Sequence, residues 1–368
     1  MDELRVPAPA FVVQRLTKEF GHAASILRGG STKIVALHDV TFDIARGESL
    51  GIVGESGSGK TTLGRILVGF ERPSAGCVLF DGKEMQALDR RERLAFRRQV
   101  QMVFQNPFSA LNPRRTVRSS LSAGLTHQKL NPDARDACLA ALLDDVGLSP
   151  GMLDRYPHEL SGGQRQRIVL ARALAVNPRI IVADEPVSAL DVSVQAQVLN
   201  LLTRLKSARQ LTVVMITHDL RVANFFCDRV AVMYLGRLVE VGPRRTVMAR
   251  AWHPYTRMLL WAAPTGNPNA RRTRQWVQGE AHGSIEQVGC VFRSRCWLYQ
   301  KLDRPVRCDH EEPTLRSLGT GEAAACHFAE MVPHRAELGL AEGATHALSK
   351  DAIAGPANDA ILTPSRAK

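Results

Sequence analysis

One glycine-rich segment has the residue types and spacing of a phosphate-binding loop. It spans residues 54–61 and lies between an apolar stretch, 48–53, and a stretch with helical spacing, 62–68. Glycines let backbone N–H groups turn toward phosphate oxygens, and a helix N-terminus adds partial positive charge. Lys60 would reach the β- and γ-phosphates, and the Thr61 hydroxyl would hold Mg²⁺. We therefore predict a nucleoside triphosphate site that contains Gly54, Ser56, Gly57, Ser58, Gly59, Lys60, Thr61 and Thr62.

Two adjacent acids, Asp184 and Glu185, end an apolar stretch that begins at residue 180. At the end of a buried strand, Asp184 suits an acid that binds Mg²⁺ through water. Glu185 is then placed to polarise an attacking water as a general base. The alternative is a pair of acids that cap a helix N-terminus, which is the weaker interpretation after four residues of buried type.

The elements that must position these residues alternate along the chain. Apolar stretches typical of strands at 48–53, 100–104, 180–185 and 211–216 are separated by helical patterns, so the sequence predicts an α/β fold with a largely parallel core sheet. A strand is also expected at 11–16, with Phe20 after its end. Further strand patterns at 34–37, 40–44, 77–80 and 230–241 predict an added antiparallel β-subdomain. Helices are expected at 84–98, 116–147 with a start near Pro132, 160–175 and 192–206.

Composition sets broad limits on function. The chain of 368 residues has room for two domains, and 48 Lys and Arg against 36 Asp and Glu give a net charge of +12. Such a charge suits nucleic acid, anionic lipid or a phosphorylated ligand without choosing among them, and most of the arginines are expected to be solvated surface charge. No apolar run is long enough to cross a bilayer, and the acidic start lacks the apolar core of a secretory signal. A cytosolic protein, peripheral if it works at a membrane, is expected.

Residues 160–167, Leu-Ser-Gly-Gly-Gln-Arg-Gln-Arg, resemble the signature motif of ABC-type ATPases. In that family two nucleotide-binding domains pair head to tail, and each signature serine meets the γ-phosphate held by the other domain. The resemblance assigns this contact to Ser161 and its neighbours Gly162, Gly163 and Gln164, and the free N–H groups of a helix start suit an anion. A serine that simply caps an amphipathic helix is the compatible alternative.

Other positions match the same family in order. The resemblance implies that Gln105 contacts Mg²⁺ beside a membrane partner, and that Asp191 belongs to a loop crossing the dimer. It implies that His218 contacts the γ-phosphate and the catalytic glutamate, and that Phe20 stacks on adenine. It also implies the fold: a P-loop NTPase with a parallel core sheet, an antiparallel β-subdomain and a helical subdomain.

Three segments resemble the ATPases of oligopeptide and dipeptide importers: residues 104–114, 188–197 and 253–256. The resemblance implies an ATP-hydrolysing subunit that works with a second ATPase subunit, a copy or a paralogue, on the cytoplasmic face of the membrane. Two permease subunits and an external solute-binding protein would complete the importer, with no nucleic acid involved. Nickel and glutathione importers share much of the pattern. A soluble ABC ATPase and a P-loop kinase or GTPase are the remaining alternatives.

Four of the seven cysteines gather near the C-terminus, with spacing C-x5-C-x11-C-x17-C; they are Cys290, Cys296, Cys308 and Cys326. This spacing lacks the paired C-x2-C steps of common zinc sites, and a metal-free, thiol-lined core is slightly favoured from the residues alone. Four thiolates also suit Zn²⁺ or a [4Fe–4S] cluster. The segment resembles the C-terminal extension of peptide-importer ATPases. In some of these ATPases the extension looks like a four-cysteine iron–sulfur site, and this resemblance favours the cluster. His310 and His327 are nearby spare ligands, expected to lie outside the first shell.

The expected organisation has three parts. Residues 1–245 form the nucleotide-binding domain, residues 246–330 form the C-terminal extension, and the alanine-rich residues 331–368 form a disordered tail.

Overall fold

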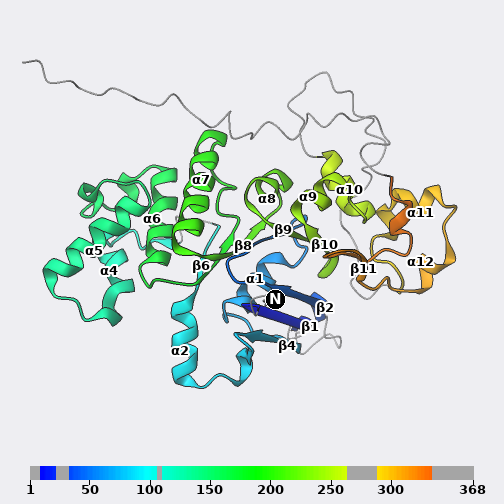
Figure 1. Ribbon diagram of the computed structural model, residues 1–368, viewed down its shortest axis with the longest axis horizontal. Helices are drawn as coiled ribbons and strands as arrows, with labels where there is room; N and C mark the ends of the chain where they lie inside the picture. Colours follow the sequence, from blue (N-terminus) through cyan, green and yellow to red (C-terminus); the bar gives the residue numbers. More distant parts are fainter. Residues whose placement is uncertain (1–8, 22–32, 106–109, 263–287, 334–368) are drawn as a thin grey trace, which may run out of the picture.

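A computed structural model describes residues 9–21, 33–105, 110–262 and 288–333. The predicted tail lies outside the described residues from residue 334 onward. In Figure 1 the described chain is elongated, with a group of helices at one end, a large sheet in the middle and the C-terminal segment at the other end.

The central sheet is mixed, with a parallel core, as the α/β prediction requires. Its strands are β3 (Ser49–Val53), β6 (Val100–Val103), β7 (Ile180–Asp184), β8 (Thr212–Thr217), β9 (Arg229–Tyr234), β10 (Arg237–Pro243), β11 (Arg316–Gly319) and β12 (Glu322–Ala324). They lie in the order β11-β12-β10-β9-β3-β8-β7-β6, and the pairs between β9 and β6 are parallel. The prediction that 230–241 joins an added β-subdomain is therefore wrong. Its apolar run extends the core sheet, with β9 parallel to β3 and β10 antiparallel to β9.

A second, antiparallel sheet confirms the β-subdomain over the remaining strands. It has the order β2-β1-β4-β5 and consists of β1 (Phe11–Gly21), β2 (Lys33–Ile44), β4 (Ala75–Phe80) and β5 (Lys83–Glu84). Two predicted boundaries were wrong: β1 continues through Phe20, and 34–37 and 40–44 are one strand. The β1–β2 pair absorbs local irregularity through register shifts, and Arg15 and Asp39 take a positive φ there, so polar interruptions do not end the strands.

The helices begin where the sequence supplies capping residues. Asp89 and Glu92 form a reciprocal capping box at α2, so this helix begins at Arg90 and not at 84 as predicted. Pro132 occupies the first turn of α5 as predicted. The α-helices are α1 (Lys60–Leu67), α2 (Arg90–Gln99), α4 (Val117–Leu125), α5 (Pro132–Asp145), α6 (Gly162–Leu174), α7 (Val192–Arg209), α8 (Leu220–Phe226), α9 (Arg244–Ala249), α10 (Pro254–Ala262), α11 (Trp297–Lys301) and α12 (Val306–His310). Short 3₁₀ turns are η1 (Met85–Ala87), η2 (Thr126–Gln128), η3 (Pro150–Met152), η4 (Pro157–Glu159), η5 (Arg293–Arg295) and η6 (Ala329–Met331).

Alternation along the parallel strands divides the core into two layers. In β8, Val213 and Met215 join the layer that contains α6, α7 and α8, whereas Val214 and Ile216 join the layer that contains α1 and the antiparallel sheet. All six residues of β8 are buried, which is typical of a parallel strand covered on both faces. Covering both faces leaves the strand ends as the places where polar groups of the core sheet meet solvent.

The C-terminal segment is joined to the central sheet. Within it β12 pairs with β10, at Glu240–Ala324 and Val241–Ala323, and β11 pairs with β12. The Arg237 side chain forms an ion pair with Glu312 of the same segment. The predicted domain boundaries at 245 and 330 stay predictions, but the extension shares hydrogen bonds with the nucleotide-binding part.

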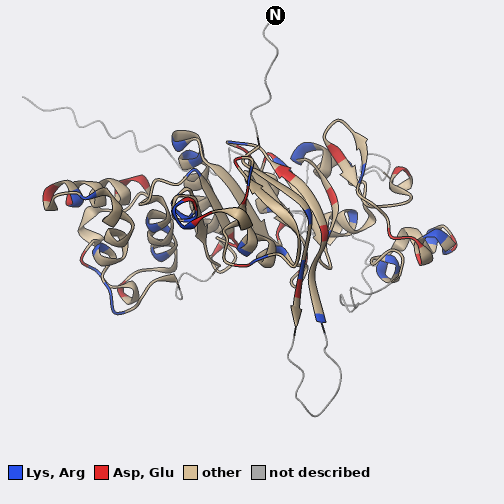
Figure 2. Ribbon diagram, turned by 90° about the horizontal axis from the view of Figure 1, so that it is seen from below, with Lys and Arg blue, Asp and Glu red and all other residues tan. Residues whose placement is uncertain are grey.

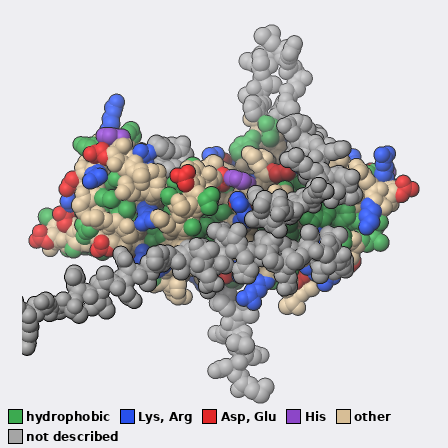
Figure 3. Space-filling model, turned by 90° about the horizontal axis from the view of Figure 1, so that it is seen from above, with side chains coloured by type: hydrophobic (Ala, Val, Ile, Leu, Met, Phe, Trp, Pro, Cys, Tyr) green, Lys and Arg blue, Asp and Glu red, His purple; other side chains and the backbone are tan. Residues whose placement is uncertain are grey.

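Basic and acidic side chains are mixed over the described surface (Figure 2, Figure 3). Figure 2 shows basic and acidic residues on the same elements, and Figure 3 shows them intermingled with apolar side chains over one face of the described surface. Arg118, for example, bridges Asp136 and Asp154. Among the described residues, no helix is both long and apolar enough to span a bilayer.

Candidate nucleotide site

The predicted site residues of the core gather at one edge of the parallel sheet. β3 leads into the glycine loop, β7 ends at Asp184, β8 ends just before His218, and β6 ends two residues before Gln105. Because these four strands are parallel neighbours, their carboxyl ends lie at the same edge, where ligands of open α/β sheets bind. The topology thus brings together residues that are up to 164 positions apart, from Gly54 to His218.

Glycines are required where the loop passes other backbone. A Cβ on Gly54 would lie 2.2 Å from the Met233 carbonyl oxygen, and one on Gly59 would lie 2.4 Å from the Ala36 oxygen. Gly59 also has φ +97°, in the region that glycine favours, immediately before α1 begins. The loop is further held by the Gly236 N–H, which donates to the Ser58 carbonyl at 3.0 Å. These glycines fit both the predicted phosphate binding and close packing against β2 and the β9–β10 turn.

The Lys60 ammonium lies inside the loop. It donates to the carbonyls of Gly54 at 2.8 Å and Glu55 at 2.7 Å, and it lies 3.3 Å from the Ser58 hydroxyl. Burial lowers the pKa of Lys60, and the nearby charges of Glu185, Asp184 and Glu55 act in the opposite direction. A buried cation ringed by carbonyls at a helix start is suited to bind an anion.

Thr61 and Asp184 form the predicted pair for a metal ion. The Thr61 hydroxyl donates to the Asp184 carboxylate at 3.2 Å, across 123 residues of sequence. Burial raises the pKa of Asp184; the Thr61 hydrogen bond lowers it, and the adjacent Glu185 raises it. A buried carboxylate beside a hydroxyl, at the edge of a loop that suits phosphates, has the oxygen chemistry that Mg²⁺ prefers.

Glu185 connects the remaining predicted residues. Its carboxylate accepts a hydrogen bond from the Gln105 amide at 2.9 Å and lies 3.1 Å from Nδ1 of His218. Glu185 also has φ +46°, although it is not glycine, and its N–H donates to the Ile216 carbonyl at 2.9 Å. Backbone held in this uncommon region by its surroundings is typical of functional positions. The structure therefore brings Gln105, Glu185 and His218 together; sequence analysis expected Gln105 on Mg²⁺, and here its amide donates to the Glu185 carboxylate.

Ser161 caps α6, so the alternative interpretation of a helix cap is confirmed. Its hydroxyl accepts from the Gln164 N–H at 3.3 Å, and the Gln164 side chain accepts from the Ser161 N–H at 2.9 Å. Ser161 remains exposed, at the group of helices seen at one end of Figure 1. A Cβ on Gly163 would lie 2.6 Å from Val194 of α7, whereas Gly162 has more space. Gly163 thus also serves helix packing, and its predicted contact with a partner's phosphate stays a prediction.

Phe20 and Asp191 are further members of the predicted site. Phe20 is half-buried on β1, with the Lys18 ammonium 4.7 Å from its ring centre. Asp191 occupies the N-cap position of α7, where its side chain makes no capping hydrogen bond, and it is exposed. Close to it, the Ser188 hydroxyl donates to the Glu185 carbonyl at 3.1 Å, so this loop is tied to the strand end that carries the acids.

The four C-terminal cysteines line one small cavity of about 20 Å³, together with aromatic residues and His327. Burial raises the pKa of each thiol, to about 12 for Cys296 and about 11 for Cys308. His327 is bound to the Glu311 carbonyl at 2.9 Å. Among the described residues no group of three or more His, Cys, Asp or Glu side chains is arranged to hold a single metal ion. The four cysteines thus share the lining of one cavity without converging on the position of a single metal ion.

Two residues that contact the phosphate loop, Tyr255 and Arg295, were not predicted from the sequence to be functional. The Glu55 N–H donates to the Tyr255 hydroxyl at 2.9 Å, and Arg295 forms a two-armed ion pair with the Glu55 carboxylate at 2.8 and 3.0 Å. Tyr255 belongs to the segment 253–256 and Arg295 to the cysteine-containing segment, and both segments indicated only a family resemblance. The local sequence could not reveal a partner 200 and 240 residues away.

Comparisons with known proteins place this geometry in a family. Residues 37–188 match the family model described as ABC transporter, and residues 239–301 match the one described as oligopeptide/dipeptide transporter, C-terminal region. A Brucella ovis protein provisionally named a peptide import ATP-binding protein is 45% identical over 86% of this chain and 97% of its own length. A dipeptide transport ATP-binding protein of Haemophilus influenzae is 43% identical over 80% of this chain and 89% of its own.

Solved structures match the core in the same way. Part of an ABC transporter complex from Clostridium perfringens has a TM-score of 0.57 and 28% identity, over 65% of this chain and 90% of that one. An ATP-binding cassette solved as a dimer after hydrolysis, with ADP and phosphate bound, has a TM-score of 0.56 and 31% identity, over 64% of this chain and 99% of that one.

Proposed function

The chain belongs to the ABC transporter ATPases that carry the C-terminal region of oligopeptide and dipeptide transporters, and on that premise we propose that it powers the import of peptides. It is an ATPase of this family, and ATP with Mg²⁺ is its general requirement. The observation that carries ATP hydrolysis is the common edge at which the phosphate loop, Asp184, Glu185 and His218 meet, and the match to the C-terminal region of oligopeptide and dipeptide transporters carries the choice of peptides.

In the proposed site the loop residues bind the triphosphate. Backbone N–H groups between Ser56 and Thr62 surround the phosphate oxygens, and Lys60 moves its ammonium from loop carbonyls to the β- and γ-phosphates. Phe20 stacks on the adenine. Thr61, Gln105 and, through water, Asp184 would hold Mg²⁺, which would neutralise phosphate charge when bound.

Glu185 is the proposed general base. Its carboxylate takes the proton of the attacking water, and this role is supported by its place directly after the acid that serves the metal. His218, 3.1 Å away, fixes the carboxylate and contacts the γ-phosphate. Gln105 holds the other carboxylate oxygen at 2.9 Å. Together the two contacts orient the base before the water attacks the γ-phosphate.

The complete site requires a second ATPase subunit. Ser161, Gly162, Gly163 and Gln164 contact the γ-phosphate held by the partner, and Asp191 crosses the interface. The exposed position of Ser161 at the start of α6 supports this arrangement. The partner is a copy of this chain or a paralogue.

Mixed dimers test the shared site. If the pair is homodimeric, Lys60→Ala and Ser161→Arg chains each lack activity alone, and mixing them restores part of it. One of the two composite sites in the mixed dimer retains both elements, so up to half of the wild-type activity is expected in that species. Absence of ATP-dependent dimerisation in the full complex would contradict the shared site.

Peptide import through two permease subunits and an external solute-binding protein is tested by co-purification. Integral membrane subunits that bind near residues 105–118, followed by peptide-stimulated ATP turnover in the reconstituted complex, are the expected result. Stimulation by nickel or glutathione in place of peptide would move the chain to the importers that share these motifs. Recovery without membrane subunits would favour a soluble ABC ATPase.

For the C-terminal cysteines we propose a [4Fe–4S] cluster with a structural role, held by Cys290, Cys296, Cys308 and Cys326. The all-sulfur donor set around one cavity supports it. Each iron of such a cluster takes one thiolate, so the sulfurs need not converge on one point as four zinc ligands must. Anaerobic purification with iron and sulfide analysis and a visible spectrum tests the cluster. Stoichiometric zinc, or a metal-free protein with an intact C-terminal fold, would contradict it.

A further inference from the structure

The C-terminal extension holds one residue of the phosphate loop, Glu55, from two directions. The Tyr255 hydroxyl accepts a hydrogen bond from the Glu55 N–H at 2.9 Å, and both terminal nitrogens of Arg295 donate to the Glu55 carboxylate at 2.8 and 3.0 Å. A planar guanidinium that meets a carboxylate with two parallel bonds fixes both position and orientation. The loop that is proposed to bind phosphate is therefore shaped partly by residues far outside the nucleotide-binding motifs.

The groups that hold Glu55 are themselves fixed by packing. Tyr255 is fully buried, and the Arg295 side chain is only 8% exposed. Phe292 packs against Tyr234 and Tyr255 at ring-centre distances of 5.1 and 5.4 Å, and Arg295 lies 5.8 Å from the Tyr234 ring centre. This aromatic cluster leaves the guanidinium and the hydroxyl little freedom, so both are set before any ligand arrives.

Glu55 is also in contact with the cation of the loop. Its carbonyl accepts a hydrogen bond from Lys60 at 2.7 Å. The N–H and carboxylate of Glu55 thus belong to the extension, while its carbonyl belongs to the phosphate-binding lysine. Any shift of Glu55 moves a group that touches Lys60.

The carboxylate of Glu55 is an electrostatic liability for a triphosphate. A negative charge on the loop repels the incoming anion, and this repulsion is strong where water is partly excluded. Glu55 is about one-third exposed at its side chain, so solvent alone screens it incompletely. The Arg295 guanidinium supplies the opposing charge at hydrogen-bond distance.

We propose that Arg295 is a positioning residue for ATP: it neutralises Glu55 and, together with Tyr255, holds the phosphate loop in its binding shape. The proposal rests on the proposed ATP site, and it assigns to the C-terminal extension a part in nucleotide affinity. Arg295 acts through Glu55 and does not touch the phosphates. The competing role is simple docking of the extension onto the core, which would leave ATP affinity unchanged in a folded variant.

A pair of variants separates these roles. Arg295→Gln leaves the Glu55 charge unopposed, so ATP affinity in the purified full complex should fall about tenfold, which corresponds to about 1.4 kcal/mol. Glu55→Gln removes the charge itself, and its affinity should stay within about threefold of wild type. The double variant should bind ATP like Glu55→Gln, which is a rescue relative to Arg295→Gln. Affinity is measured by titration with ATP and Mg²⁺, with KM and kcat measured alongside; KM should rise while kcat at saturating ATP changes little.

Arg293→Gln is the matched control. Arg293 belongs to the same η5 turn, but it binds the Val288 carbonyl and lies 3.7 Å from Asp309, away from the loop. Its ATP affinity should equal that of wild type. Tyr255→Phe, which keeps the ring and removes the acceptor for the Glu55 N–H, should weaken binding by a smaller factor, about threefold.

The outcomes are distinguishable. Wild-type affinity in folded Arg295→Gln would overturn the inference, as would a double variant as weak as Arg295→Gln. If Arg295→Gln does not fold, Tyr255→Phe decides: unchanged affinity in that folded variant overturns the inference, and weaker binding supports it. Failure of the wild-type complex to bind ATP would instead overturn the proposed function.

Discussion

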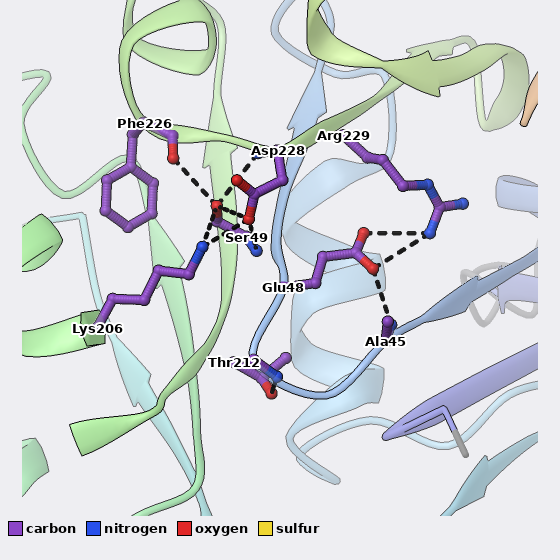
Figure 4. Close-up of polar contacts among 9 residues, drawn as sticks. Ala45, Glu48, Ser49, Lys206, Thr212, Phe226, Asp228 and Arg229 are labelled. Carbon is purple, nitrogen blue, oxygen red and sulfur yellow. Dashed lines mark hydrogen bonds and ion pairs between the residues drawn. The ribbon is translucent and has the colours of Figure 1, made fainter. Parts of the chain in front are cut away.

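The two ends of β3 carry polar clusters that are built in opposite ways. At the amino end, shown in Figure 4, each acid has a basic partner: Glu48 accepts from Arg229, and Asp228 accepts from Lys206. The fully buried Ser49 hydroxyl lies between them, bonded to the Asp228 carboxylate, the Lys206 ammonium and the Phe226 carbonyl. This cluster is satisfied by its own residues.

At the carboxyl end Asp184 and Glu185 have no Lys or Arg within ion-pair distance among the described residues, although Glu55 of the phosphate loop is paired with Arg295. Asp184 accepts from the Thr61 hydroxyl, and Glu185 contacts the Gln105 amide and the His218 ring. The buried Lys60 ammonium binds carbonyls and forms no ion pair within the described part of the chain. Two carboxylates without a Lys or Arg partner, Asp184 and Glu185, and the Lys60 ammonium without an ion pair suit this end to bind a metal ion and phosphates. Strand β3 thus has a stabilising cluster at its amino end and the proposed nucleotide site at its carboxyl end.

Removing the base should have the largest effect. Glu185→Gln should lower ATP turnover in the assembled complex by about a hundredfold or more, because a positioned base contributes roughly 10²–10⁴-fold to rate. ATP binding should persist, since the amide keeps the shape of the side chain. Glu48→Gln changes an acid at the other end of β3 and should leave turnover per folded molecule unchanged. Turnover near wild type in Glu185→Gln would contradict its assignment as the base.

Asp184→Asn should separate stability from function. Because burial raises its pKa, ionised Asp184 costs folding free energy, and this cost grows as pH rises through the interval between the unfolded and folded pKa values. Without nucleotide and with a chelator present, the variant should therefore unfold at a higher temperature than wild type at pH 7. The difference should shrink as the pH falls toward about 4.

With ATP and Mg²⁺ present the order should reverse. Ligand stabilises the state that binds it, and only the wild-type carboxylate serves the metal ion. Thermal unfolding of both proteins, with and without ligand at several pH values, gives the comparison. A variant that is less stable than wild type in the ligand-free state would show that the charge of Asp184 is already compensated, as that of Asp228 is at the amino end.

Ser49→Ala should have the smallest effect on function and a defined effect on stability. Loss of the buried hydroxyl removes one hydrogen-bond partner each from Lys206, Asp228 and the Phe226 carbonyl, at a cost of about 1–3 kcal/mol in the free energy of unfolding. ATP turnover per folded molecule should not change. Denaturant unfolding measures the cost, and Ser119→Ala, at an exposed position of α4, is the control. An unchanged free energy would mean that the amino-end cluster repacks without the hydroxyl.

Local sequence determined the nucleotide-binding elements of this protein. The glycine loop is recognisable because the residues that bind phosphate are neighbours in the chain, and their spacing is set by backbone geometry. The same holds for Asp184 with Glu185 at a strand end and for Ser161 with Gln164 at a helix start, where capping is a contact between residues three apart. The predicted α/β class followed from the same local periodicities.

Only the tertiary structure decided which distant groups meet. The strands at 229–243 join the core sheet and not the antiparallel one, because pairing depends on which neighbour the folded chain presents. Strand boundaries at β1 and β2 were missed because register shifts between paired strands accommodate irregular residues. The contacts of Tyr255 and Arg295 with Glu55 span 200 and 240 residues, and no periodicity encodes a contact at that separation. Their motifs are visible in the sequence, but their position against the phosphate loop exists only in the folded chain.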